Sequence, residues 1–422
     1  MNRSIGFLNR AIPVIGGLLF VAGLASCGGG VVGSGGTGIT TGMAVGTVNG
    51  FGSVIVDGVA YDDRGAPVVS EVAPGQDAVS EVKLGDRVAV QYRSVGVAGL
   101  VRVEAALSGS VASAVSDGQF SMLGQTVAIN TRGAAGPITQ LGGGYSQVSD
   151  LRVGDAVEVH GVLVRQTGAY QIQATRIERL PRAPAYLRVT GVVDDLGSDR
   201  TFSLGVLKVD ASSAAVLPAS TALARGQMVT VLALPSRLTT PAGGLRMDAA
   251  QVRIRELSSG GLEDSLSGSV SHLDVLARTL SLGGVLVDYS AAVMAPATAM
   301  PANGQYVLVR GKAVGAGLLL AASLTVRDAG SDSEAALRGN SRSYDPANVR
   351  FFVRDVLVDA SGAVTLGCPT AGPTNGQFVA VEGSLNSTGV LARKVRCEDE
   401  PPDAQVERDG VAGAVDIAGA TF

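Results

Sequence analysis

Residues able to carry acid–base or metal chemistry are few and scattered in this chain of 422 residues. Its two histidines, His160 and His272, lie far apart in the sequence. Neither has a second ligand at the spacing of a metal motif such as HExxH or CxxC. The sequence therefore predicts no zinc site, and we expect both histidines at the surface.

Carboxylates cluster at four places without forming a recognisable site. A calcium loop needs several oxygens at set spacing and a turning glycine, and no cluster fits that pattern. We expect solvated turn residues, with Asp194 to Asp199 the place where a weakly bound ion would be sought. The clusters are Asp62-Asp63; Asp194-Asp195 with Asp199; Asp328 with Asp332 and Glu334; and Glu398-Asp399-Glu400.

One short stretch matches a cofactor motif by letter alone. The residues 33–38, GSGGTG, fit the dinucleotide pattern GxGxxG. They lie within the Gly/Ser/Thr-rich segment 28–44, where no strand is predicted before them and no helix after them to face a pyrophosphate. No cofactor and no catalytic residue is therefore predicted.

The chain has three cysteines with two different expected roles. Cys368 and Cys397 form an isolated pair near the C-terminal end. In an exported protein such a pair predicts a disulfide, although two buried free thiols are the alternative. Cys27 stands apart, at the end of an N-terminal apolar segment.

That N-terminal segment has the features of an export signal. Arg3 and Arg10 precede an apolar stretch of about 13 residues, which is too short to span a bilayer. Leu24-Ala25-Ser26-Cys27 resembles the bacterial lipobox, and this resemblance implies cleavage after Ser26 and acylation of Cys27. Gly28 in place of Asp implies, by the same resemblance, an outer-membrane location facing the periplasm or the surface. Residues 27–44 would then form a flexible tether from the lipid.

Composition argues against nucleic acid as a partner. Without residues 1–26 the chain carries 31 basic and 37 acidic residues, a balance of −6, with no basic block. Binding to single strands usually needs aromatics in a basic groove. Here the aromatics are scattered and are expected to fill small cores: Phe51, Tyr61, Phe120, Tyr170, Phe202, Tyr289, Tyr306, Phe352 and Phe378.

A short motif recurs through the chain and predicts an array of one structural unit. It consists of Gly, then Asp or Gln, then valines alternating with other residues, which is typical of a turn that starts a half-buried strand. The five glycines are 69, 72, 78 and 72 residues apart. The motif positions are Gly85 and Asp86; Gly154 and Asp155; Gly226 and Gln227; Gly304 and Gln305; and Gly376 and Gln377.

The spacing predicts five all-β repeats at 45–107, 108–182, 186–257, 265–328 and 335–400, called repeats 1 to 5 below. Each is expected to contain about five short strands, because tight turns separate its alternating apolar stretches. Such a unit suits a small antiparallel barrel, whose closure removes exposed strand edges. The tail 401–422 resembles the start of a sixth repeat, and we expect residues 403–422 to be disordered because an isolated hairpin is marginally stable.

Residues 46–58, GTVNGFGSVIVDG, follow the lipobox and the Gly-rich tether, and every repeat carries the Gly-Asp/Gln strand. In these features the chain resembles bacterial lipoproteins of the domain-of-unknown-function family 5666. The resemblance implies OB-like barrels and no established activity.

We therefore expect a non-enzymatic, lipid-anchored protein of the cell envelope that acts as a multivalent binding or scaffold array. Its expected partners are the membrane, through the anchor, and another envelope protein or polysaccharide. Two alternatives stay open: an envelope hydrolase or its accessory subunit, and a structural spacer.

Overall fold

The computed structural model describes residues 41–131, 135–166, 168–257, 261–315, 317–328, 334–369 and 372–398. Within these ranges the chain is all-β, as predicted, with two short 3-10 turns, η1 (Val148–Asp150) and η2 (Pro235–Arg237), and no α-helix. None of these residues forms a helix with the length and hydrophobicity needed to cross a bilayer. Cys27 and the tail 403–422 lie outside the described residues.

Repeat 2 shows the plan of the barrel. The opening strand β8 pairs with β12, β12 with β13, β13 in parallel with β10, and β10 with β9. A bridge between Val111 and Met122 closes the ring from β8 to β9. The short β11 adds to β13 in parallel. The strands are β8 (Leu107–Ser110), β9 (Gln119–Met122), β10 (Gln125–Ile129), β11 (Gln140–Gly142), β12 (Ala156–Gln166) and β13 (Ala169–Arg179).

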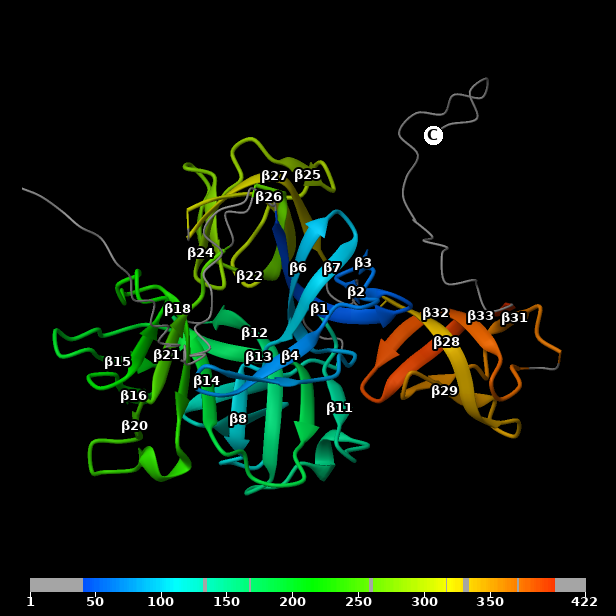
Figure 1. Ribbon diagram of the computed structural model, residues 1–422, viewed down its shortest axis with the longest axis horizontal. Coiled ribbons are helices and arrows are strands. Elements are labelled where there is room, and N and C mark those ends of the chain that lie inside the picture. Colours follow the sequence, from blue (N-terminus) through cyan, green and yellow to red (C-terminus); the bar gives the residue numbers. More distant parts are fainter. Residues whose placement is uncertain are drawn as a thin grey trace, which may run out of the picture. The chain divides into compact units, whose positions relative to one another are not determined.

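Repeats 4 and 5 have the same order of pairing. Figure 1 shows most of their strands by label. The strands of repeat 4 are β22 (Asp264–Asp274), β23 (Thr279–Leu282), β24 (Val285–Asp288), β25 (Val293–Ala295), β26 (Tyr306–Val314) and β27 (Leu318–Arg327). The strands of repeat 5 are β28 (Glu334–Asp345), β29 (Arg350–Val353), β30 (Val356–Asp359), β31 (Val364–Leu366), β32 (Phe378–Asn386) and β33 (Gly389–Glu398).

Repeats 1 and 3 elaborate the plan. Repeat 1 adds a hairpin, β4 and β5, along its closing strand β7. In repeat 3 the closing strand is interrupted, so that β20 pairs with β16 and β21 with β18. Repeat 1 has β1 (Gly42–Phe51), β2 (Val54–Val56), β3 (Val59–Tyr61), β4 (Val68–Ala73), β5 (Gln76–Val79), β6 (Arg87–Ser94) and β7 (Val97–Val103). Repeat 3 has β14 (Leu187–Val192), β15 (Thr201–Leu204), β16 (Leu207–Asp210), β17 (Ala215–Leu217), β18 (Met228–Ala233), β19 (Leu238–Thr239), β20 (Arg246–Asp248) and β21 (Gln251–Ile254).

Two details of the predicted barrel need correction. Each repeat has at least six described strands, because a short strand such as β25 joins the five that close the ring. The barrels are also not purely antiparallel, since the third and last strands of the ring run parallel, as β24 and β27 do. The alternating apolar positions nevertheless point inward as expected: Val285 and Val287 are buried, whereas Leu286 between them is half exposed.

Strands also pair between repeats that are distant in sequence. The first half of β1 pairs in parallel with β22 of repeat 4, and its second half pairs in parallel with β28 of repeat 5. The opening strands β8 and β14 pair antiparallel. Buried apolar residues accordingly form clusters shared by repeats 2 and 3 and by repeats 1 and 5. The repeats are therefore joined through their opening strands.

The predicted disulfide is present in repeat 5. Cys368 and Cys397 are joined by an S–S bond of 2.04 Å, with a sequence separation of 29 residues. It fastens the segment after β31 to the closing strand β33, where Cys397 is buried.

Replacing both cysteines by Ala should lower the free energy of unfolding of repeat 5 by about 3 to 4 kcal/mol, because the unfolded loop is no longer closed. Chemical denaturation of the double variant, compared with the wild-type chain under oxidising conditions, measures this loss. An unchanged transition, or labelling of wild-type thiols without reductant, would contradict the predicted role of the bridge.

Candidate functional site

The five predicted turn glycines share one backbone conformation. Their φ angles are 83°, 88°, 82°, 85° and 86° at positions 85, 154, 226, 304 and 376. Glycine reaches this left-handed region without the steric penalty of a side chain. In every repeat the glycine N–H donates to a carbonyl of the opening-strand segment, from Gly85 to Val48 in repeat 1 and from Gly154 to Val111 in repeat 2. The glycine thus links its turn to the start of its own barrel.

The residue after each glycine completes the turn with its side chain. An oxygen of Asp86, Asp155, Gln227, Gln305 and Gln377 accepts a hydrogen bond from the backbone N–H three residues earlier, at 2.8, 2.9, 2.7, 3.1 and 3.3 Å. Asp and Gln can replace each other here because both supply a carbonyl-type oxygen acceptor. The recurring motif therefore has a structural role in every barrel.

Repeat 1 uses this turn in a second way. A Cβ built on Gly85 would lie 2.4 Å from the carbonyl oxygen of Thr175 in repeat 2. The four equivalent glycines have no atom within 4 Å of such a Cβ. Asp86 is 3% exposed and Arg87 is 6% exposed. The turn of repeat 1 is therefore buried against its neighbour.

His160 lies at this junction, and its expected surface position is wrong. The imidazole is 2% exposed. Its Nε2 atom lies 3.5 Å from Asp86 Oδ1 and 3.2 Å from Glu158 Oε1. Its Nδ1 atom accepts a weak hydrogen bond, 3.3 Å long, from the backbone N–H of Arg87. The histidine therefore joins a strand of repeat 2 to the turn of repeat 1.

Further charged groups extend the junction on the side of repeat 2. Arg176 Nε lies 3.6 Å from Asp86, and its Nη1 donates to the carbonyl of Leu84. Arg176 also pairs with Glu178 at 2.7 Å, and Glu178 pairs with Lys83 at 2.5 Å. We call Lys83, Asp86, Glu158, His160, Arg176 and Glu178 the acid–base junction. Because its buried charges are matched, removing one partner would leave another charge uncompensated.

The environment changes the proton affinities of this junction. Burial lowers the pKa of His160, but the nearby carboxylates of Asp86 and Glu158 outweigh burial, so the pKa lies above its ordinary value. Burial raises the pKa of Asp86 even though His160 and Arg176 oppose the rise. The carboxylates of Asp86 and Glu158 thus favour the protonated imidazolium form of His160. The hydrogen bond from the Arg87 N–H favours the neutral form instead, because Nδ1 can accept it only without a proton, but this bond is weak.

A second polar cluster joins repeat 1 to repeat 4. Asp57 accepts hydrogen bonds from Ser267 Oγ at 2.5 Å and Tyr306 Oη at 2.9 Å, and from the N–H of Thr47. The Arg87 guanidinium donates to Thr47 Oγ1 at 3.1 Å, and to the hydroxyl and the carbonyl of Ser267 at 3.1 and 3.0 Å. Arg87 therefore contacts repeats 2 and 4 from one position, through its backbone and its side chain.

Carboxylates of repeat 1 bind repeat 3 in the same manner. Glu71 accepts hydrogen bonds from Arg253 at 2.7 Å and Gln251 at 2.8 Å, and its backbone carbonyl accepts one from Arg188. Burial would raise the pKa of Glu71, but the bonds from Arg253 and Gln251 hold it below its ordinary value. Arg255 pairs with Glu104 at 2.8 Å. Each of repeats 2, 3 and 4 is thus bonded to repeat 1 by polar side chains.

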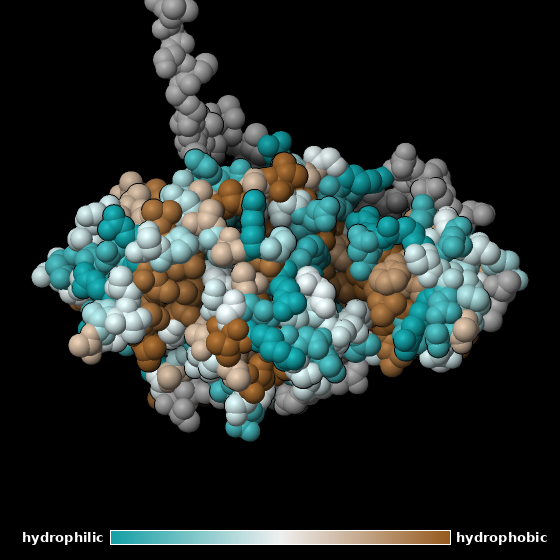
Figure 2. Space-filling view, turned by 90° about the horizontal axis from the view of Figure 1, so that it is seen from below, coloured by the Kyte–Doolittle hydropathy of each residue, from teal (hydrophilic) through white to brown (hydrophobic). Residues whose placement is uncertain are grey.

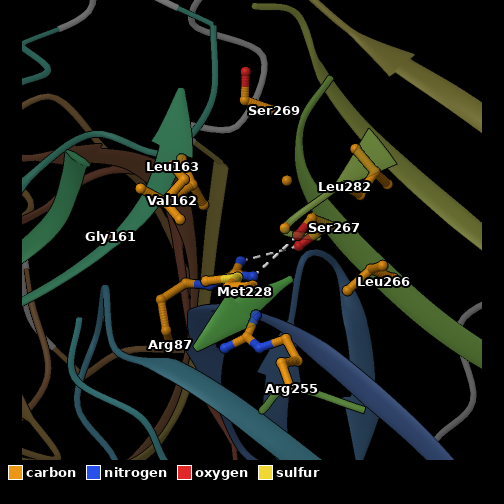
Figure 3. Close-up of a pocket in the computed structure, with 12 residues that line it drawn as sticks. Arg87, Gly161, Val162, Leu163, Met228, Arg255, Leu266, Ser267, Ser269 and Leu282 are labelled. Atoms are coloured by element: carbon orange, nitrogen blue, oxygen red, sulfur yellow. Dashed lines mark hydrogen bonds between the residues drawn. The ribbon is translucent and has the colours of Figure 1, made fainter. Parts of the chain in front are cut away.

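A small pocket opens where repeats 1 to 4 meet (Figure 3). Its polar lining includes Arg87, Arg255 and Ser267, and its apolar lining includes Met228 and Leu282. The Ser267 hydroxyl donates directly to Asp57, so no imidazole lies between them as a general base would. The two arginines make the lining positively charged, but Ser267 is not arranged as the activated nucleophile of a hydrolase.

The other predicted positions lie apart from this site. His272 is exposed near the end of β22, and its ring centroid is 6.4 Å from that of Tyr170. Asp199 is engaged by Thr201, and Asp195 by Lys208 and Arg225. Within the described ranges, no group of three or more His, Cys, Asp or Glu residues is placed to hold a metal ion. Most of the predicted core aromatics are buried, but Phe352 is 37% exposed.

Comparison with known families agrees with part of the predicted resemblance. Residues 108–178 match the model of a domain of unknown function (DUF5666). The match spans nearly all of repeat 2, from β8 to β13, and therefore includes Gly154 and His160. None of the curated proteins compared with the chain matches it.

Gly85→Ala should destabilise the chain more than Gly154→Ala. Both substitutions place a side chain at positive φ, which costs about 1 to 2 kcal/mol. Only Gly85→Ala must also displace the Thr175 carbonyl. Free energies of unfolding from urea titrations measure the difference, and equal losses would mean that the turn of repeat 1 is not packed against repeat 2.

His160 should make stability depend on pH. Because its pKa is raised in the folded state, its stabilising contribution is fully present below its ordinary pKa of about 6.5 and is lost as the pH rises through the raised value. His160→Gln should therefore reduce the decline in melting temperature of the chain as the pH is raised above about 6.5. His272→Gln is the control at the exposed histidine, and equal pH profiles for both variants would refute the assignment.

Proposed function

We propose that this chain is a non-enzymatic, lipid-anchored protein of the cell envelope, built as a scaffold of small barrels that presents binding surfaces. The anchor is supported by the sequence: two arginines, an apolar stretch and the lipobox-like residues ending at Cys27 precede the Gly-rich segment. Acylation at Cys27 would hold the barrels at the membrane, and Gly28 in place of Asp favours the outer membrane, with the barrels facing the periplasm or the surface. The OB-like character and the tandem count of five belong to this proposal.

The main support for the scaffold is that the buried charged groups are bonded to residues of other repeats. Asp57, Asp86 and His160 each bind a residue of another repeat. Glu71 does the same towards repeat 3. Groups of this kind could serve as acids or bases in a hydrolase, but here they are matched in contacts between barrels. Their arrangement supports a fixed cluster of repeats over the alternative of an envelope hydrolase.

Exposed apolar side chains favour a binding role over that of a spacer. On the face of Figure 2, apolar residues gather in patches divided by polar ones. Repeats 4 and 5 expose apolar residues at positions equivalent in strand register: Val293 and Val364, and Leu320 and Leu391, are 72%, 62%, 44% and 43% exposed. Two barrels that carry similar apolar faces can bind extended partners with avidity.

In-cell crosslinking, affinity recovery and mass spectrometry of the full chain would test this proposal. One envelope protein or polysaccharide should be recovered above background, and its recovery should fall for Cys27→Ala because that variant loses its location. Leu391→Asp should weaken recovery without loss of the anchor, whereas Val206→Asp on repeat 3 is the matched exposed control. Recovery of abundant neighbours alone would support the spacer instead.

A further inference from the structure

Repeat 4 carries an unusual share of the exposed apolar surface. Of the 18 large hydrophobic residues exposed in the described part of the chain, seven lie within residues 265–328. They are Val275, Leu276, Leu286, Val293, Met300, Val314 and Leu320. Singly exposed apolar residues are ordinary, but a concentration on one barrel indicates a contact surface.

Four apolar residues form a continuous face on the outside of this barrel. Leu286 of β24 and Val314 of β26 both pair with Leu318 of β27, so the three lie in one row across the sheet. Leu320, two residues further along β27, points to the same side. Lys312 is paired with Leu320 and is also exposed, which places a positive charge beside the apolar row.

The turn between β22 and β23 presents a further apolar residue. Leu276 is 98% exposed. Asp274 fixes the turn by accepting hydrogen bonds from the N–H groups of Leu276 and Ala277. Repeat 5 has the same type of turn, in which Asp345 accepts from Ala347 and Asn348, with alanine at the position of Leu276. Because the turn does not require leucine, its projection into solvent needs another explanation.

The chain that would lead to the lipid meets the protein at this same barrel. Thr41 bridges to Gly261, Leu262 donates to the carbonyl of Thr41, and the N–H of Met43 donates to Asp264. From there β22 runs to the Leu276 turn, at most about 35 to 40 Å away. The 14 residues from Cys27 to Thr41 can span at most about 50 Å. The anchor can therefore occupy the lipid surface that the turn would touch.

We propose that repeat 4 rests on the lipid surface through the Leu276 turn and the face formed by Leu286, Val314, Leu318 and Leu320. This inference rests on the proposed acylation of Cys27, and it adds a second, non-covalent membrane contact. It assigns the Leu320 face of repeat 4 to the lipid and leaves the equivalent Leu391 face of repeat 5 to the envelope partner. Apolar side chains enter the boundary between head groups and acyl chains, while Lys312 lies at the level of the phosphates. The contact sets the orientation of the barrels, which a flexible tether alone would leave free.

The absence of tryptophan from the sequence allows a direct test. Leu276→Trp and Leu320→Trp each give the full acylated chain a single tryptophan at the proposed contact. Val206→Trp is the control, because Val206 is 74% exposed in the turn between β15 and β16 of repeat 3. The proteins are bound to vesicles of phosphatidylethanolamine and phosphatidylglycerol whose acyl chains carry bromine, a quencher of tryptophan.

We expect the emission of the Leu276→Trp and Leu320→Trp chains to shift to shorter wavelength and to lose intensity, with no change for Val206→Trp. The proposal would be overturned if the emission of both the Leu276→Trp and Leu320→Trp chains matched that of the Val206→Trp control. A blue shift that grows with protein concentration without vesicles would also overturn it, because a second copy of the chain would then cover the face.

Flotation with the vesicles reports the anchor separately. If the chain floats but its tryptophan is not quenched, the membrane contact is wrong and the anchor stands. The double variant Cys27→Ala, Leu276→Trp, mixed with excess vesicles, tests the contact without the anchor. Quenching of its tryptophan supports the contact even if mass spectrometry of the wild-type chain finds Cys27 unmodified.

Discussion

Each barrel depends on a reciprocal pair of backbone hydrogen bonds between its opening strand and its glycine turn. In repeat 1 the N–H of Gly85 donates to Val48, and the N–H of Val48 donates to Asp86. Repeats 2 to 5 form the same two bonds between the equivalent residues. The positive φ of the glycine directs its N–H toward the opening strand, and the following Asp or Gln satisfies the backbone behind it. Each pair of bonds thereby closes a barrel around a core that is mostly aliphatic.

Repeat 1 shows how one copy of a common turn can acquire a new role. Its glycine and aspartate keep the turn geometry of the other repeats, yet both are buried between barrels, whereas the equivalent residues of repeats 2 to 5 are exposed or only partly buried. Asp86 still accepts the bond from the N–H of Lys83, and its second oxygen faces His160 and Arg176. One oxygen of the Asp86 carboxylate thus completes the turn, and the other joins repeat 1 to repeat 2. The Arg87 side chain donates to Ser267 and so joins repeat 1 to repeat 4.

Local patterns allowed much of the barrel to be predicted. Alternating valines, the recurring glycine and the cysteine pair act within one repeat, so their consequences follow from short stretches of sequence. The contacts of His160 could not be found in this way, because Asp86 is 74 positions away and the histidine occurs in a single repeat. Strand β25 was missed for another reason. It has three residues and is fixed by pairing with β27, not by an alternating pattern of its own.

Pairing of β1 with both β22 and β28 limits how this array can change its length. Repeat proteins whose units contact only their neighbours can lose or gain an internal copy, since the flanking copies can meet again. Here Ala44 is in register with Ser265, and Gly50 with Ala336. Deleting repeat 4 would bring a different barrel to the first half of β1 or leave that half as an open edge, which invites pairing with other chains. The first strand therefore constrains the loss of the barrels that contain β22 and β28, and variation is expected within the loops of each barrel.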